Sequence, residues 1–198
     1  MIESGFDIWT LVAYLGLGLL IWGGFWVIMP GVYGTPGTMS RPGLIRAALK
    51  LAEVKPGDKV YDLGAGDGRV AVMAAREFQA HGVGVEIDPA HCLVAWGRAL
   101  LSGVIGRVSI RQKNLFDAKL DDADVVFVYL TPALIERLRP QLILKLRPGA
   151  RIVSVYFPIE GWKPVDVDIG YLVFAYRTPS EPGSVDDFLK EWSRRPPQ

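Results

Sequence analysis

The sequence predicts an α/β domain with a doubly wound sheet, preceded by one membrane-spanning helix. Two observations predict the domain. A glycine-rich turn at residues 64–68 follows an apolar run that ends at Leu63, and short apolar runs alternate with helical patterns over residues 59–157. A third observation predicts the spanning helix, because no charged residue lies between Asp7 and Arg41.

Residues 8–29 contain no charge and reach the length of a membrane span. As a helix they would measure about 33 Å, which is enough to cross the hydrocarbon core of a bilayer. A cleaved signal peptide is the rival interpretation, but two acids and no base precede the run, and the run is too long. We therefore expect an uncleaved anchor over residues 1–30 that contacts the lipid bilayer through residues 8–29, with a buried apolar hairpin as the remaining alternative.

Basic residues set the expected orientation. None precedes the span, whereas Arg41, Arg46 and Lys50 follow it closely. The positive-inside rule then places the N-terminus outside and the domain in the cytoplasm. We expect a single-pass protein of a prokaryotic cell membrane.

Three further parts follow the anchor. Residues 31–43, rich in glycine, proline and threonine, are expected to form an irregular connector, and residues 44–178 to form one globular domain. The tail, residues 179–198, is polar except for one short amphipathic helix, which Ser184 and Asp187 would open with a capping box. We expect this helix to pack on the domain, with the membrane interface as the alternative.

Turn residues and hydrophobic periodicity place the elements of the domain. Pro42 and Pro89 each open a helix, and Pro148-Gly149 ends another. An uninterrupted apolar run at residues 124–130 is typical of a central buried strand. In chain order we expect a helix from residue 42, a strand at 59–63, a helix at 70–78, a strand at 82–87, a helix at 89–101, strands at 108–113 and 124–130, a helix at 133–146, a strand at 151–157 and a hairpin of 165–168 with 171–176.

The glycine turn carries the chemistry of the predicted site. Gly64 and Gly66 have no Cβ, so they allow backbone conformations closed to other residues and let a ligand lie against the main chain. Gly68 lets the next helix start close to the strand. Glu86 ends the adjacent strand, where its carboxylate can accept hydrogen bonds from both hydroxyls of a ribose. A glycine turn without a ligand is the alternative.

The glycine spacing and one acid indicate which nucleotide binds. A dinucleotide site has the spacing G-x-G-x-x-G, but here the glycines fall as G-x-G-x-G, and Arg69 occupies the third dinucleotide position. Asp67 would repel a pyrophosphate and suits a ligand with an ammonium group. The sequence therefore favours S-adenosylmethionine over NAD or FAD as the cofactor.

Residues at the ends of the other strands complete the predicted site. Open α/β sheets bind ligands at the carboxyl ends of their strands, so Asn114 can hydrogen-bond the adenine, with Ile87 and Leu115 as apolar walls. The alternative for Asn114 is a turn residue that caps its own segment. Tyr129 would emerge at the rim, beside the methyl group.

Charge and cysteine content argue against several other partners. The part after residue 40 holds 22 basic and 19 acidic residues, a net charge of 22 − 19 = +3, which is too mild to indicate nucleic acid. Cys92 is the only cysteine, and His81 and His91 are the only histidines. A disulfide framework is therefore excluded, and we expect no metal site.

With these motifs in view, the chain resembles the seven-strand, class I methyltransferases, whose first motif runs D-L-G-x-G-x-G. Within that class it is similar to the membrane-anchored protein-lysine methyltransferases that act on the c-ring protein of ATP synthase and the adenine nucleotide translocase, and to their prokaryotic relatives. The likeness rests on D-L-G-A-G-D-G-R at residues 62–69, G-V-E-I-D at 84–88 and F-P-I-E-G-W-K-P at 157–164.

The resemblance implies a Rossmann-like, seven-stranded sheet with an antiparallel last strand. It also implies S-adenosylmethionine as methyl donor and, as acceptor, a lysine side chain of a protein at or in the membrane. Carried over by motif, Gly64, Gly66, Asp67 and Gly68 hold the methionine end of the donor, Glu86 the ribose and Asn114 the adenine, while Asp62 orients the loop or reaches the methionine amine.

An aromatic pocket is expected to receive the lysine amine. A lysine starts as an ammonium with a pKa of about 10.4, and apolar aromatic surroundings lower that pKa, while a cation–π contact still admits the charged form. Tyr129, Phe157 and Trp162 are the candidate catalytic residues. For Phe157 and Trp162, loop residues packed into the core are the alternative.

Three functions follow from these observations. The first is a membrane-anchored methyltransferase that acts on a lysine side chain of a protein. The second keeps the cofactor but transfers the methyl group to a lipid or another small membrane-associated molecule. The third is a scaffold that binds S-adenosylmethionine without turnover.

Overall fold

A computed structural model describes residues 7–32 and 41–193 of the chain. The chain divides into two compact units, residues 1–37 and 38–198, and each is described by itself. Residues 33–40, most of the connector predicted at 31–43, lie outside the described residues.

In the first unit the described residues form helix α1 (Ile8–Val32). No helix in the described part of the chain is both long and apolar enough to cross a bilayer. The structure therefore confirms a helix over residues 8–29 and gives no support to the prediction that it spans a membrane.

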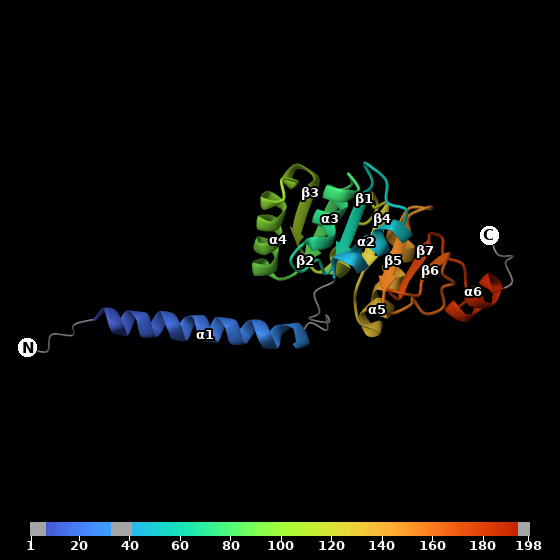
Figure 1. The fold of residues 1–198 in the computed structure, drawn as a ribbon. Coiled ribbons are helices and arrows are strands. Elements are labelled where there is room, and N and C mark those ends of the chain that lie inside the picture. The colour runs from blue at the N-terminus through green and yellow to red at the C-terminus, as the bar shows by residue number, and fades with distance from the viewer. Residues whose placement is uncertain (1–6, 33–40, 194–198) are drawn as a thin grey trace, which may run out of the picture. The chain divides into compact units, whose positions relative to one another are not determined.

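The second unit is built on one seven-stranded sheet in the order β3-β2-β1-β4-β5-β7-β6 (Figure 1). Strands β3, β2, β1, β4 and β5 are parallel to one another, whereas β7 runs antiparallel to both of its neighbours. The α/β sheet with an antiparallel last strand is thus confirmed. The strands are β1 (Lys59–Leu63), β2 (His81–Glu86), β3 (Val108–Gln112), β4 (Val125–Val128), β5 (Arg151–Val155), β6 (Asp166–Asp168) and β7 (Val173–Arg177).

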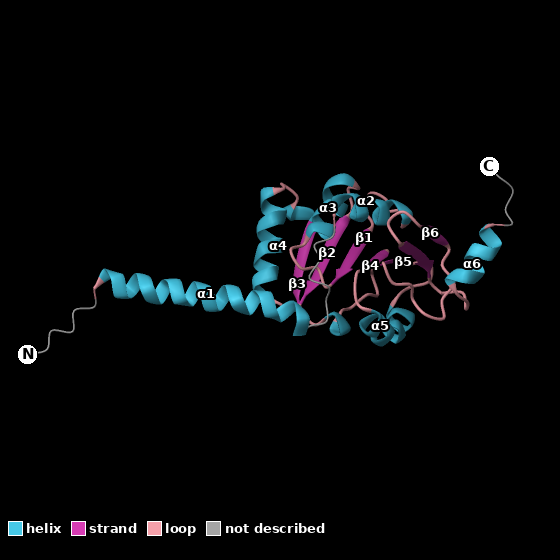
Figure 2. Cartoon of the chain, turned by 60° about the horizontal axis from the view of Figure 1, so that its bottom comes forward, coloured by secondary structure: helices cyan, strands magenta, loops and turns pink. Residues whose placement is uncertain are grey.

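Helices cover both faces of this sheet (Figure 2). On one side lie α2 (Pro42–Leu51), α3 (Arg69–Glu77) and α4 (Pro89–Leu101), and on the other lies α5 (Pro132–Lys145). The central strand β4 alternates between two buried clusters. Val126 and Val128 belong to the cluster that contains the buried α5 side chains, and Val125 and Phe127 belong to the one that contains those of α2. A strand buried on both faces explains the uninterrupted apolar run.

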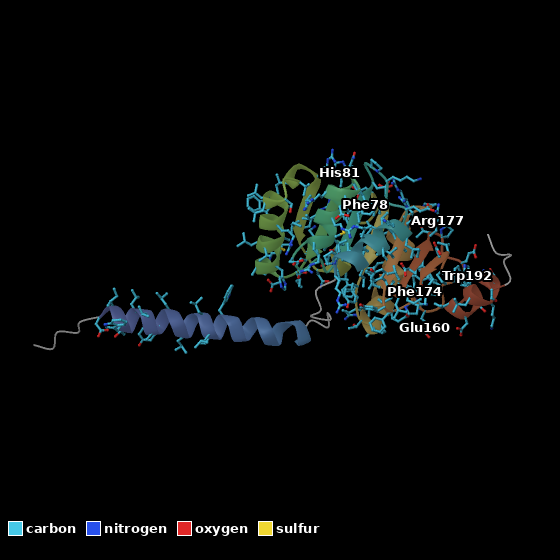
Figure 3. The ribbon with its side chains drawn as sticks, in the orientation of Figure 1. Phe78, His81, Glu160, Phe174, Arg177 and Trp192 are labelled. Atoms are coloured by element: carbon cyan, nitrogen blue, oxygen red, sulfur yellow. The ribbon has the colours of Figure 1, made fainter. Side chains whose placement is uncertain are left out.

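The tail helix α6 (Val185–Trp192) packs on the domain, as expected. Ser184 and Asp187 form the predicted capping box, Phe188 is buried, and the Lys163 ammonium lies 2.7 Å from the Glu191 carboxylate. Trp192, at the end of the helix, is exposed (Figure 3). Phe188, the partly buried Val185 and this ion pair therefore hold α6 against the domain.

Two short 3-10 helices were not predicted: η1 (Ile105–Arg107) and η2 (Leu115–Asp117). Strand β5 also ends at Val155, two residues before the expected end. Its end coincides with Tyr156, whose φ of +65° lies in the left-handed region and cannot continue a strand.

Candidate functional site

The predicted site residues lie at the carboxyl ends of neighbouring parallel strands. The glycine turn follows β1, Glu86 ends β2, Asn114 follows β3 and Tyr129 follows β4. Because parallel strands end at the same edge of a sheet, the topology brings these four segments together. This edge is where ligands bind in open α/β sheets.

The three glycines of the turn all have positive φ, at +88° for Gly64, +51° for Gly66 and +73° for Gly68. A Cβ on Gly66 would meet no atom within 4 Å, so this main chain borders open space. A Cβ on Gly68 would come within 2.7 Å of the Ala95 Cβ. Gly66 therefore leaves room for a ligand, whereas Gly68 allows α3 to start against α4.

Glu86 faces the glycine turn from the end of β2. One carboxylate oxygen, Oε2, accepts a hydrogen bond of 2.8 Å from the Gly66 N–H. The other, Oε1, accepts from the N–H groups of Ile87 at 2.9 Å and Asp88 at 3.0 Å. The side chain is only 9% exposed. A carboxylate offers about four lone-pair directions, so Glu86 keeps acceptor capacity beyond these three bonds.

Asp62, in β1, is a buried carboxyl group that no residue in the described part of the chain contacts with a hydrogen bond. Burial, followed by the negative charges of Glu86 and Asp67, raises the pKa of Asp62 to about 8. A buried polar group without a partner is costly. This arrangement suits a ligand that brings a positive charge or a hydrogen-bond donor to Asp62.

Asp67 is held by cations of this chain. Its carboxylate forms ion pairs with Arg69 and, at 2.7 Å, with Arg98 of α4. Arg98 Nε also donates to the Asp67 carbonyl oxygen at 3.0 Å. Burial acts to raise the pKa of Asp67, but the hydrogen bond from Arg69 and the charges of the two arginines lower it overall. Asp67 is thus paired with two arginines of this chain. Of the acids Asp62, Asp67 and Glu86, Asp62 is the one without a described hydrogen-bond partner.

Asn114 caps η2, since its Oδ1 accepts a hydrogen bond of 3.1 Å from the Phe116 N–H. Its side-chain amide nitrogen still offers two donors, and the residue is exposed. Ile87 is also exposed, whereas Leu115 is half-buried against the core. The capping alternative is therefore observed, and it leaves the donors of Asn114 available for an adenine.

Tyr129 pairs with Tyr156, a residue that the sequence analysis missed. The two rings meet edge to face with their centroids 5.3 Å apart. The Tyr156 N–H donates to the Leu172 carbonyl at 2.8 Å, and Tyr156 and Leu172 both have positive φ. Such strain in non-glycine residues clusters at functional sites. Tyr156 could have been found from the strand order, because β5 lies beside β4 and ends at the same edge.

Trp162 lies in the core of the domain. It is only 6% exposed and packs edge to face on Tyr176, at 5.9 Å between ring centroids, in the core cluster of the α5 side. Tyr129 packs against the cluster of the α2 side. Phe157 is partly exposed directly after Tyr156. Trp162 is thus packed into the core, as the alternative for this residue stated, whereas Phe157 is not.

Comparison with known families identifies a family that this chain matches. The family described as "ANTKMT methyltransferase domain" matches residues 62–166. This range begins at Asp62 and includes the glycine turn, Glu86, Asn114 and the two tyrosines.

Several curated relatives carry names that bear on the acceptor. A "Protein-lysine N-methyltransferase" of Saccharolobus islandicus is 41% identical over 125 residues, which are 63% of this chain and 78% of that protein. The "Adenine nucleotide translocase lysine N-methyltransferase" of Mus musculus is 34% identical, over 62% of this chain and 53% of that protein. The match thus spans about half of the mouse relative.

Among solved structures, an RNA methyltransferase from Salinibacter ruber in complex with S-adenosyl-L-homocysteine is similar to this chain. The two are 37% identical with a TM-score of 0.69, and the match covers 75% of this chain and 96% of that one. S-adenosyl-L-homocysteine is what remains of S-adenosylmethionine after its methyl group has been transferred.

Proposed function

The chain belongs to the ANTKMT methyltransferase domain family, and from this membership we propose that it methylates the side-chain amine of lysine in a protein. It is a methyltransferase that uses S-adenosylmethionine. The single observation that carries the assignment of the site is the buried Asp62 carboxyl, which has no described hydrogen-bond partner and lies beside the glycine turn and Glu86.

The residues at this edge fit the cofactor group by group. Asp62 would accept the methionine ammonium, and Glu86 would accept the ribose hydroxyls with its remaining acceptor capacity. Gly66 lets the ligand lie on the main chain, because no atom lies within 4 Å of where a Cβ would be. Asn114, Ile87 and Leu115 would contact the adenine. When bound, S-adenosylmethionine supplies a methyl group on a sulfonium, which is a strong electrophile.

The acceptor side requires an amine that is uncharged and aligned with the methyl carbon. A lysine ammonium has a pKa of about 10.4 in water, and desolvation lowers that pKa. Tyr129 and Tyr156 offer aromatic surface at the rim, and the exposed Phe157 follows directly after Tyr156. Their faces can attract the charged amine, and their apolar surface favours loss of its proton, which can leave through water. We assign this role to Tyr129, Tyr156 and Phe157.

A lysine acceptor is supported by the names of the Saccharolobus islandicus and mouse relatives. RNA is a second candidate, because the Salinibacter ruber relative is named an RNA methyltransferase. The experiment is incubation of the purified chain with cell extract, membranes and S-adenosylmethionine labelled on its methyl group. Label in a protein band that disappears when one lysine is changed to arginine supports the proposal. Label in RNA, or label extracted with lipid, would contradict it.

We also propose that the enzyme is tethered to a membrane, with its N-terminus outside and its domain in the cytoplasm. Support comes from the uncharged run of residues 8–29 and from the exposed apolar side chains of α1 between Ile8 and Trp22. A tether would raise the effective concentration of substrates at the membrane. Extraction of cell membranes with alkaline carbonate tests this. Recovery of the full chain in the soluble fraction would overturn the tether and leave the methyl transfer untouched.

A further inference from the structure

A hollow of about 210 Å³ lies at the amino ends of β1, β2 and β3, the edge of the sheet opposite to the proposed cofactor site. Strand β2 rises by about 17 Å between His81, which lines the hollow, and Glu86, so the two sites are separate. This space is called the basic hollow below. The charged and polar side chains that line it are those of Lys59, His81, Arg107, Ser109, Arg111 and Asp122.

The register of the sheet places the strand residues of the basic hollow on one face. Lys59 lies opposite His81, and Val83 lies opposite Ser109. Tyr61 and Val83 belong to the buried cluster on the α5 side. Side chains two residues apart in a strand point to the same face. The face on the α5 side therefore carries Lys59, His81, Ser109 and Arg111.

This face is left open because the connection from β3 to β4 contains no α-helix. Residues 113–124, all of them described, make this connection and form only the 3-10 helix η2, whereas an α-helix usually joins two parallel strands. Helices α3 and α4 pack on β3 from the other face (Figure 2). His81 is exposed and lies at the margin of the domain (Figure 3). Solvent therefore reaches the basic hollow.

Asp122 is the one acid among the described residues that line the basic hollow, and it is already paired. Its carboxylate lies 2.7 Å from the Lys59 ammonium and accepts a hydrogen bond of 2.7 Å from the Tyr61 hydroxyl. Burial, followed by this hydrogen bond, raises the pKa of Tyr61 to about 12, so the hydroxyl keeps its proton. Two positive charges of the hollow, on Arg107 and Arg111, remain without an ion pair to a described residue.

The two arginines keep most of their hydrogen-bond donors. Arg111 lies over the Tyr61 ring, with its guanidinium carbon 5.2 Å from the ring centroid, and donates to the Tyr61 hydroxyl at 2.9 Å. A guanidinium has about five N–H donors in a planar fork, so the others remain available. Arg107 is exposed and forms no hydrogen bond with a described residue. The exposed Ser109 hydroxyl adds a further donor.

We propose that the basic hollow binds the phosphate group of a small molecule. Arginine forks match the oxygens of a phosphate, which they bind through parallel N–H···O bonds. A phosphate monoester carries about −1.5 to −2 charges at pH 7, which balances the charges of Arg107 and Arg111. The hollow has room for about seven water molecules at about 30 Å³ each, less than the about 300–1,000 Å³ of a site for a drug-sized ligand. It therefore holds the phosphate, and the rest of the ligand extends into solvent.

Other ligands fit the basic hollow less well. A carboxylate carries one charge and two oxygens, so it would leave one of the two arginines without a partner. S-adenosylmethionine contains no phosphate, so the ligand of the basic hollow is not the methyl donor. The inference is therefore independent of the cofactor site and of which acceptor is methylated.

The test uses the two histidines of the chain as reporters. His81 lines the basic hollow, whereas His91 lies in the first turn of α4. The full chain is labelled with ¹³C in histidine only and kept in a non-ionic detergent, and His81→Gln assigns the two ring signals in the NMR spectrum. Inorganic phosphate, a nucleoside monophosphate or acetate is then titrated at constant pH and ionic strength.

We expect both phosphates to change the His81 signal saturably, at concentrations at which acetate does not, while the His91 signal stays the same. Arg107→Gln should weaken phosphate binding about tenfold. The matched control is Arg76→Gln on α3, an exposed arginine outside the basic hollow, which should leave the affinity unchanged. Tighter binding of the nucleoside monophosphate would identify an organic phosphate as the ligand, and equal binding would identify free phosphate. Both results support the proposal.

Several outcomes would overturn the proposal. One is a His81 signal that neither phosphate saturates, and another is equal affinity for acetate. A third is phosphate affinity that Arg107→Gln leaves unchanged. Displacement of phosphate by S-adenosylmethionine would place the anion in the cofactor site instead, and a response to a short RNA but to neither phosphate would replace the small ligand by a nucleic acid. Unchanged binding of S-adenosylmethionine by Arg107→Gln shows that the fold is intact.

Discussion

The backbone N–H of Gly66 donates a 2.8 Å hydrogen bond to the Glu86 carboxylate. This bond joins the loop after β1 to the end of β2 across the opening of the proposed cofactor site. The same carboxylate accepts two further N–H groups, from Ile87 and Asp88. Glu86 therefore fixes the shape of the loop and also offers acceptors to a ligand.

Replacing Glu86 by glutamine should weaken cofactor binding while the domain stays folded. Glutamine has nearly the same shape, but it lacks the charge and one acceptor oxygen. Hydrogen bonds to charged groups contribute about 1.5–3 kcal/mol, so we expect affinity for S-adenosylmethionine to fall about 10- to 100-fold. Titration calorimetry measures it. Glu77→Gln on α3 is the control, since Glu77 pairs with Arg46 away from this edge. Unchanged affinity of Glu86→Gln would remove Glu86 from the site.

The titration of Asp62 should make cofactor binding depend on pH. Burial and then the charges of Glu86 and Asp67 raise the pKa of Asp62 to about 8, whereas an α-ammonium group has a pKa of about 7.7–8.0. Binding pairs the ionised carboxylate with the charged ammonium, so below pH 8 Asp62 must release a proton. Affinity should rise about tenfold from pH 6 to pH 7 and be greatest near pH 8. Calorimetry in buffers of different ionisation enthalpy reports the released proton. Asp62→Asn should abolish the release, and release that persists in this variant would assign it to another group.

The ionisation of Asp62 should also make folding stability depend on pH. Stability should fall with rising pH, whereas cofactor affinity should rise. The pKa of Asp62 is raised in the folded state, from the ordinary value of 3.8 to about 8. The folded protein therefore holds a proton that the unfolded chain has lost, and the free energy of unfolding should decrease as pH rises from about 4 to about 8. Denaturant unfolding across this range measures the decrease. Asp62→Asn lacks the titrating group and should show a smaller decrease. Parallel curves for the two proteins would mean that Asp62 ionises normally when folded.

Two glycines of the turn should respond differently to alanine. Gly68→Ala places a Cβ within 2.7 Å of the Ala95 Cβ at a φ of +73°. Left-handed strain of about 1–2 kcal/mol and overpacking of about 1–3 kcal/mol should lower the free energy of unfolding by about 2–5 kcal/mol. Adding Ala95→Gly should restore part of it, which thermal unfolding of the single and double variants would show.

Gly66→Ala meets no protein atom at its Cβ and should lower stability by only the strain, about 1–2 kcal/mol. The added methyl group would occupy space proposed for the ligand, so binding of S-adenosylmethionine should fall much more than folding stability does. Calorimetry and thermal unfolding on the same sample separate the two effects. Normal affinity in a folded Gly66→Ala protein would place the ligand elsewhere.

Local signals allowed most of the fold to be predicted from sequence. Helix α4 was predicted with its observed bounds because Pro89 opens it and Gly103 follows it. The position of Glu86 at the carboxyl end of β2 followed from the apolar run that precedes it. The features that were not predicted depend on contacts between residues far apart in the sequence. Nothing near Asp67 indicates Arg98, 31 residues away, and the burial of Trp162 depends on Tyr176. The strained φ of Tyr156 likewise needs its bond to Leu172.

Tyr156 provides the sharpest test of the acceptor pocket. Its ring meets Tyr129 edge to face, and it is one of the aromatic residues proposed to surround the lysine amine. Tyr156→Ala should lower kcat/KM for the methylated protein about 10- to 100-fold, through loss of cation–π attraction and of aromatic surface. Affinity for S-adenosylmethionine should stay the same, because Tyr156 is proposed to contact the acceptor amine and not the cofactor. Tyr156→Phe keeps the ring and should retain most of the activity.

Tyr171→Ala is the matched control for this test. Tyr171 is 43% exposed and Tyr156 is 42% exposed, and Tyr171 precedes Leu172, whose carbonyl accepts the Tyr156 N–H, so its replacement controls for disturbance of that backbone contact. Its replacement should leave kcat/KM unchanged. If Tyr156→Ala and Tyr171→Ala lower activity equally, the effect of Tyr156 is structural, and the amine must reach the methyl group by another route. If kcat/KM falls for Tyr156→Ala alone, with normal cofactor affinity, the loss lies on the acceptor side of the reaction.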